Sequence, residues 1–159
     1  MSSQVLSAQV IADPVLGPWI RFLRAHAAVT RRLSARLEAQ HAMTLSDFDV
    51  LAQLYLAPER SLRRIDLARR VLLTASGITR LLDRLERAGW VAKRPCESDA
   101  RVTYAVLTEE GARKFEAARA SHLADIEELF ASRLTDDELR RLGELLAKLP
   151  LADTACADD

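Results

Sequence analysis

The chain has 159 residues, of which 49% are hydrophobic and only 5% aromatic, and its 23 basic and 23 acidic side chains leave no formal net charge. This length and composition, with five glycines and five prolines, suit one mostly helical domain around one core. No apolar run of about 18 residues and no signal-like start is present, so we expect a cytoplasmic chain with no membrane segment. Cys96 and Cys156 are far apart, and we expect free thiols.

The charge is distributed unevenly along the chain. Residues 60–101 contain eleven basic and five acidic side chains, whereas residues 102–159 contain seven and thirteen. A basic excess confined to one third of a short chain is typical of a surface that meets phosphate groups. A solvated helix face is the alternative explanation of the same pattern.

The first predicted helix, residues 15–40, is unusually long and contains "WIRFLRAHAAVTRRLSARLEAQ". It is apolar over more of its circumference than one small domain can cover, so we expect it to pack against a partner as well. The segments at the two ends of the chain, residues 1–13 and 151–159, are predicted to be flexible tails.

Two shorter helices are expected next. Ser46 is the predicted N-cap of the second helix, with Asp49 three residues later, and Pro58 closes it. Ser61 is the predicted N-cap of the third. Its apolar residues follow at steps of three and predict one buried edge: Leu62, Ile65, Ala68 and Val71.

The fourth predicted helix has two unlike faces, and Thr74 is its expected N-cap. One face is apolar and is expected to pack on the core: Ile78, Leu81, Leu82 and Leu85. The opposite face is polar and rich in arginine: Ser76, Thr79, Arg80, Asp83, Arg84 and Arg87. Two short helices joined so closely predict a helix-turn-helix.

An extended pair follows directly. Gly89 is placed to end the helix in a left-handed conformation, "WVAKR" is extended, and "RVTYAVL" alternates with period two after the loop "PCESDA". Thr108 then opens a fifth helix, and "TDDE" at residues 135–138 opens a sixth as a capping box. The fold class is therefore mainly α with a small β wing: a winged helix-turn-helix at 46–107, flanked by helices at 15–40 and 109–149 within a single domain.

Groove geometry connects this pattern with DNA. The major groove of B-DNA is about 12 Å wide and admits an α-helix, so Ser76, Thr79 and Arg80 could reach base edges. Gly77 lets the backbone come near the duplex, although a packing contact explains it equally well. Arg80 is the preferred base contact, because a guanidinium can bond two acceptors of guanine, whereas Arg84 could equally reach phosphate.

The extended pair would lie beside the minor groove. Arg101 could insert there, with Asp99 holding it extended, and Lys93 and Arg94 suit the flanking phosphates. Asp83 and Arg87 are expected to pair with each other. Taken singly, each charge is equally compatible with a solvated surface; their order along the chain favours DNA binding. The predicted DNA-contacting residues are Thr74, Ser76, Gly77, Thr79, Arg80, Arg84, Lys93, Arg94, Asp99 and Arg101.

The segment "LARRVLLTASGITRLLDRLERAGWVAKRPCESDARVTYAVLTEEG", residues 67–111, resembles the multiple-antibiotic-resistance regulator (MarR) family of bacterial winged-helix transcription factors. The long first helix and the two closing helices agree with that family's layout. One departure is Ala100, since relatives often carry glycine between the aspartate and the arginine of the wing.

The resemblance implies a homodimer that binds a pseudo-palindromic double-stranded DNA operator, with helices 15–40 and 109–149 forming the dimer. It also implies a repressor released by a small aromatic or phenolic effector. Candidates for the effector site are Trp19, Arg21, Arg24 and His26, because an aromatic carboxylate needs ring faces and a cation. Core packing of Trp19 and His26, and pairing of the arginines with acidic helices, are the alternatives.

Other classes of function have less support. The three histidines lack metal-ligand spacing, no phosphate-binding glycine loop or nucleophile motif is present, and we expect neither an enzyme nor a cofactor. Cys96, in the wing loop, has no neighbouring base that would activate its thiol. A winged-helix module that binds only protein is the main rival, because the fold serves that purpose too.

Overall fold

A computed structural model describes residues 12–71, 75–96 and 102–149 of the chain. The predicted mainly helical fold with a small β wing is confirmed. The predicted tails lie almost wholly outside these residues, and the assignment of the flanking helices to dimerisation stays a prediction. The elements are α2 (Leu16–His41), α3 (Leu45–Leu56), β1 (Ser61–Arg63), α4 (Arg64–Arg70), α5 (Ala75–Arg87), β2 (Val91–Pro95), β3 (Thr103–Leu107), α6 (Glu109–Leu129) and α7 (Asp136–Leu146).

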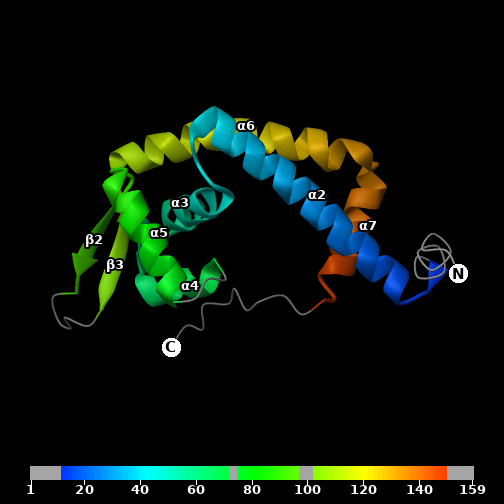
Figure 1. Cartoon of the computed structure of the whole chain (residues 1–159), viewed down its shortest axis with the longest axis horizontal. Coiled ribbons are helices and arrows are strands. Elements are labelled where there is room, and N and C mark those ends of the chain that lie inside the picture. Colours follow the sequence, from blue (N-terminus) through cyan, green and yellow to red (C-terminus); the bar gives the residue numbers. More distant parts are fainter. Residues whose placement is uncertain (1–11, 72–74, 97–101, 150–159) are drawn as a thin grey trace, which may run out of the picture.

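The helices form an arch with the winged region at one end. In Figure 1, α6 runs along the top, α2 descends beside it, and α7 lies at the end away from the strands. Arg36 of α2 ties the two long helices together through Asp125 and Glu128 of α6, at 2.5 and 2.8 Å. The strands β2 and β3 extend away from α6, on the side where α4 and α5 begin. No helix in the described ranges is long and apolar enough to cross a membrane.

Helix α3 begins two residues earlier than the sequence predicted. Thr44, rather than Ser46, is the N-cap, and its hydroxyl accepts a hydrogen bond from the Asp47 backbone N–H at 3.2 Å. The Asp47 carboxylate in turn accepts one from the Thr44 backbone N–H at 2.9 Å, which completes a capping box. Asp49, the expected partner of Ser46, is instead half-buried, and burial raises its pKa.

The prediction of a helix beginning after Ser61 is wrong for its first turn. Residues Ser61–Arg63 form β1, which pairs antiparallel with β3, and Leu62 lies opposite Ala105. Leu62 is therefore buried as a strand residue, whereas Ile65, in the first turn of α4, is 59% exposed. The three strands have the order β1-β3-β2, so the wing is an extension of a small sheet.

Two glycines set the path between α5, the sheet and α6. Gly89 ends α5 with a φ of +76°, a left-handed conformation that suits glycine, as predicted. At Gly111, a Cβ would lie 2.0 Å from the Trp90 backbone oxygen. Thr108 caps α6 by accepting from the Gly111 N–H, and Thr135 forms the expected capping box of α7 with Glu138. The strands are thus held close against the start of α6.

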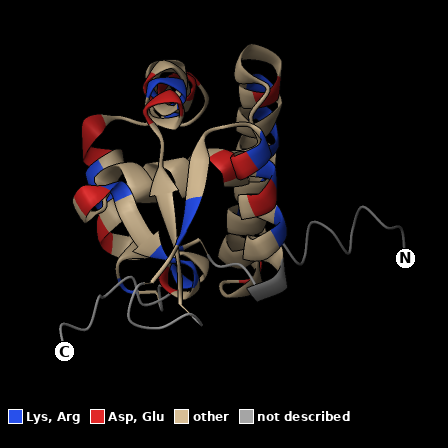
Figure 2. Ribbon diagram, turned by 90° about the vertical axis from the view of Figure 1, so that its left-hand side faces the viewer, with Lys and Arg blue, Asp and Glu red and all other residues tan. Residues whose placement is uncertain are grey.

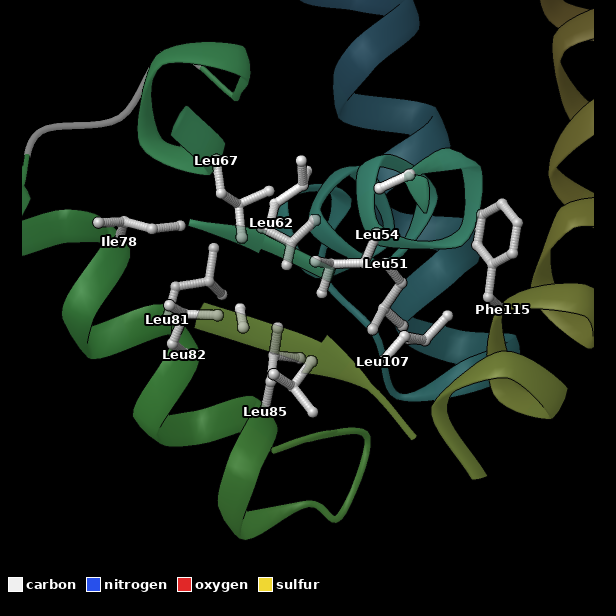
Figure 3. Close-up of a cluster of buried hydrophobic side chains, with 14 of the residues drawn as sticks. Leu51, Leu54, Leu62, Leu67, Ile78, Leu81, Leu82, Leu85, Leu107 and Phe115 are labelled. Atoms are coloured by element: carbon white, nitrogen blue, oxygen red, sulfur yellow. The ribbon is translucent and has the colours of Figure 1, made fainter. Parts of the chain in front are cut away.

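The hydrophobic core lies within the winged region, where side chains from α3, β1, α4, α5, β3 and α6 converge (Figure 3). The apolar face of α5 points into it as the sequence predicted. Every member of that face is at most 7% exposed: Ile78, Leu81, Leu82 and Leu85. Because this face is fixed in the core, the opposite side of α5, which includes the exposed Arg80, faces solvent.

The flanking helices bury much less of their apolar surface. Only Gly17, Leu33 and Leu37 are buried along the 26 residues of α2, and no residue of α7 is buried. Trp19 is 54% exposed, and Phe22 and Leu23 are each 43% exposed. The amino-terminal half of α2 therefore presents an apolar stripe to solvent.

Candidate nucleic-acid interface

Helix α5 presents its charged residues outward because its apolar residues hold the opposite face in the core. Arg80 is exposed, and Thr79 beside it accepts a hydrogen bond from Arg64 of α4 at 3.2 Å. This contact links the two helices of the helix-turn-helix on their outer side. Three predicted DNA contacts, Thr74, Asp99 and Arg101, lie outside the described residues, as does the side chain of Ser76.

Arg84 forms an ion pair and a hydrogen bond with residues of the same chain. Its Nη2 lies 2.5 Å from Asp47 Oδ1 and donates to the Thr44 hydroxyl at 3.3 Å. The Asp47 side chain is 5% exposed and the Arg84 side chain 48%, so a buried carboxylate is neutralised by a half-exposed guanidinium. The pair joins the start of α3 to the last turn of α5. Sequence reasoning missed it, although the "TLSD" capping pattern at residues 44–47 offered the signal for Asp47.

Lys93 of β2 also has partners on α5. Its Nζ bonds to the Asp83 carboxylate and lies 2.8 Å from Glu86 Oε2. The hydrogen bonds to the two carboxylates raise the pKa of Lys93, and the bond from Lys93 lowers the pKa of Asp83. Asp83 was expected to pair with Arg87, but Arg87 Nε donates instead to the Asp83 backbone oxygen at 3.1 Å. Lys93 thus fixes the angle between the helix and the wing.

Arg94 is exposed at the outer end of β2, and its guanidinium lies 5.9 Å from the centre of the Tyr104 ring on β3. Figure 2 shows the basic part of the strand, in blue, on the half nearer the wing loop. Cys96 follows and is half-buried, while Cys156 falls beyond the described ranges. The ends of β2 and β3 that lie away from α6 and the first turns of α5 are on the same side of the molecule (Figure 1).

The residues predicted to bind an effector lie along one segment of α2. Trp19, Phe22 and His26 form a row of stacked rings with centroids 6.1 and 6.3 Å apart. All four predicted residues, Trp19, Arg21, Arg24 and His26, are exposed. A cavity of about 400 Å³ opens nearby, between α2 and the end of α6, with other residues around it: Ala25, Ala28, Val29, Arg32, Leu129 and Arg133.

The described residues hold no cluster of three or more histidine, cysteine, aspartate or glutamate side chains arranged to bind a metal ion. The outward surface of α5 and β2 carries guanidinium, ammonium and hydroxyl groups, together with the carboxylates of Asp83 and Glu86 that pair with Lys93. Such donors bind phosphate oxygens and the acceptor groups of base edges.

Comparison with known proteins agrees with this geometry. Residues 43–103 match the model of the MarR family. A helix-turn-helix transcriptional regulator of Bacillus cereus is 30% identical over 131 residues, which cover 82% of this chain and 85% of the relative.

Two solved structures are similar over most of both chains. Sco3205, a MarR family transcriptional regulator from Streptomyces coelicolor in complex with DNA, has a TM-score of 0.78 at 29% identity, with 81% of each chain covered. A cysteine-to-serine mutant of MarR from E. coli, complexed with operator DNA, has a TM-score of 0.74 at 29% identity, covering 84% of this chain and 94% of that one. These relatives, together with the arginines of α5 and the strands of the wing, show that the chain belongs to the MarR family of DNA-binding transcriptional regulators.

Proposed function

We propose that this regulator is a homodimeric repressor that binds a pseudo-palindromic operator and is released by a small aromatic or phenolic effector. The observation that carries the proposal is the common orientation of α5 and the wing. A core-anchored helix with Arg80 exposed lies beside a strand with Arg94 exposed at its outer end. Because operator DNA would be its partner, we expect the protein to act in the cytoplasm.

The surface of the flanking helices supports the dimer. Trp19, Phe22 and Leu23 of α2 are large apolar side chains left 43–54% exposed, and Leu145 of α7 is 46% exposed. A second copy related by two-fold symmetry would cover this stripe with the same stripe. Pairing would also double the base contacts, since one recognition helix offers few.

The contacts divide into two roles. Ser76, Thr79 and Arg80 would read base edges from the first turns of α5, and Gly77 would let the backbone approach. Thr74, Arg84, Lys93 and Arg94 would meet phosphates, and Arg101 would enter the minor groove with Asp99 holding it. Arg84 and Lys93 would do so while keeping their partners on Asp47 and on Asp83, since each has further N–H donors.

The effector part of the proposal is supported by the cavity beside α2. Its lining combines apolar side chains with the guanidinium groups of Arg32 and Arg133, and such a mixture suits an apolar anion. The exposed ring row of Trp19, Phe22 and His26 lies on the same helix. Small aromatic carboxylates and phenols are therefore the compounds to screen.

One experiment tests the DNA part directly. Bound sequences are selected from random duplex DNA, and the affinity for the selected operator is measured by fluorescence anisotropy at several salt concentrations. We expect selection of an inverted repeat and an affinity that falls steeply with salt. Arg101→Ala should weaken binding by about 1–3 kcal/mol without changing the oligomeric state. Failure of the wild-type protein to bind any duplex at low salt would leave a protein-binding module as the function.

The effector is tested on the same complex. Aromatic carboxylates and phenols are added to the preformed complex, and loss of anisotropy identifies a releasing compound. Arg32→Ala should raise the concentration needed for release, while Arg119→Ala, on the exposed surface of α6, serves as the matched control. If no compound of either class releases the DNA, the effector part of the proposal is wrong.

A further inference from the structure

A basic depression lies beside α5, at the junction with the first turn of α3. It has a volume of about 350 Å³, and its lining includes three arginines and a serine but no carboxylate. Neither Ser46 nor Arg87 was among the residues that the sequence assigned to DNA. The lining residues are Ser46, Gly77, Arg80, Leu81, Arg84 and Arg87.

The three arginines follow the helical repeat. Residues 80, 84 and 87 are separated by four and three positions, which places their side chains along one face of α5. Both carboxylates of α5 are bound elsewhere, since Asp83 and Glu86 contact Lys93 of β2. These acids therefore pair mainly with Lys93, although the charge of Arg87 also contributes to lowering the pKa of Asp83, and the face keeps an excess of positive charge.

The acid that forms an ion pair with Arg84 is buried beneath it. Asp47 is nearly fully buried and binds Arg84 through Nη2, which leaves other N–H donors of that guanidinium for a ligand. Three guanidinium groups face one carboxylate, so the depression keeps an excess of positive charge. Asp47 also fixes Arg84 in place, so part of the depression is ordered without a ligand.

The size and chemistry suit a phosphodiester of DNA. Backbone phosphates are monoanions with exposed oxygen acceptors, and arginine binds them in a bidentate manner. The depression opens on the same helix that would enter the major groove, so a strand of the duplex would pass along it. Phosphate contacts of this kind fix the position of the protein on DNA without reading sequence.

We infer that this depression is a seat for one backbone phosphate of DNA, held by Arg84, Arg87 and the Ser46 hydroxyl. The inference rests on the proposed function and deepens it. Arg80, at the amino-terminal end of the depression, reads bases, whereas Arg87, two turns further along α5, contributes affinity alone. Ser46 joins α3 to the DNA, so the seat fixes both the depth and the rotation of α5 in the groove.

The test separates affinity from sequence preference. Affinities of the full-length protein are measured for its selected operator and for an unrelated duplex, over a range of salt concentrations. Arg87→Ala should weaken binding to both duplexes by the same factor, on the order of five- to tenfold, and should reduce the salt slope by about 1. Ser46→Ala should weaken both by a smaller common factor with an unchanged slope. Arg80→Ala should lower the preference for the operator.

Control variants separate the loss of a phosphate contact from a general change of charge and from unfolding. Arg141→Ala, an exposed arginine on α7, should leave affinity and slope unchanged. Arg87→Gln keeps a shorter polar side chain with hydrogen-bond donors but no charge, and it replaces Arg87→Ala if that variant unfolds at a lower temperature. Unchanged affinity and slope in the Arg87 variants, or a changed sequence preference, would overturn the phosphate seat while leaving the proposed function standing. Failure of the wild-type protein to bind any duplex would overturn both.

Discussion

The winged region and the flanking helices differ in how completely they bury their apolar residues. In α3 and α5 the apolar face is buried in the hydrophobic core, and Leu51 and Leu82 are at most 1% exposed. In the amino-terminal half of α2 and in α7, large apolar residues remain exposed, and Trp19 is 54% exposed. An exposed apolar stripe of this kind is typical of an interaction surface. Under the proposed function, the winged region would read DNA and the flanking helices would form the dimer.

The largest effect is expected from the closed core. Leu82→Ala removes a side chain that is 1% exposed at the centre of the α5 face, so it should destabilise the fold by about 2–5 kcal/mol. Urea unfolding followed by circular dichroism measures this. Leu56→Ala, at a leucine that is 80% exposed, is the matched control and should change stability little. Equal losses in both variants would contradict the burial of Leu82 in the hydrophobic core.

The ion pair between α3 and α5 should have the next largest effect. Asp47→Ala removes both the capping box and the partner of Arg84, so we expect a loss of about 2 kcal/mol in the free energy of unfolding. Asp136→Ala, at an exposed first-turn carboxylate of α7, provides the comparison. DNA affinity should also fall in the Asp47 variant, because α5 is less well held. Wild-type stability in this variant would show that the pair contributes nothing to the fold.

A substitution in the exposed apolar stripe of α2 should affect self-association rather than the stability of the fold. Phe22→Ala deletes a 43% exposed ring from the α2 stripe, so the unfolding of a monomer should change little while self-association weakens by about 1–2 kcal/mol. Sedimentation over a range of protein concentrations measures that change. Arg31→Ala, at an exposed position on the same helix, should leave association intact. If the Phe22 variant associates as tightly as the wild type, the stripe is not the dimer interface.

The smallest effect concerns pH at the boundary between the two regions. His122 of α6 is 6% exposed, its Nδ1 has no hydrogen-bond partner among the described residues, and its ring centroid lies 4.5 Å from that of Phe48. Burial lowers its pKa, against the opposing effect of the neighbouring Asp125, which binds Arg36. The unfolded chain therefore binds more protons than the folded one below about pH 6.5, so stability should fall as pH decreases through that value.

Thermal unfolding at about pH 7.5 and about pH 5.5 measures this dependence. His122→Phe removes the titrating group and should reduce the difference between the two midpoints. His26→Gln, at an exposed histidine, should leave the difference as it is in the wild type. A midpoint that rises on acidification through this range would mean that His122 is not buried in its neutral form.

Much of the fold could be predicted from local pattern, and the failures have identifiable causes. The faces of α5, the turn at Gly89 and the cap at Thr108 depend on nearby residues only, and each was predicted correctly. The start of α3 was misplaced because "TLSD" and "SDFD" are equivalent signals in the sequence. A distant residue, Arg84, binds the carboxylate of the first pattern and favours it.

Strand β1 and the role of Ser46 and Arg87 were not predicted, and the cause is again a contact between distant residues. Three residues at 61–63 are too short for a periodic signal, and they become a strand only by pairing with residues 104–106. The depression beside α5 depends on the approach of Ser46 to Arg87, which are 41 positions apart. Local pattern identified the arginine-bearing helix, but it could not indicate which arginines bind within the chain and which remain exposed.

The central claim is that two copies of α5 read one duplex together. The direct measurement is the mass of the complex with the selected operator, by light scattering, combined with affinities for operators whose half-site spacing is altered. We predict two chains per duplex, half-sites separated by about one helical turn of 10 base pairs, and loss of tight binding when about five base pairs are inserted. One chain per duplex, or affinity that is indifferent to that insertion, would contradict the account.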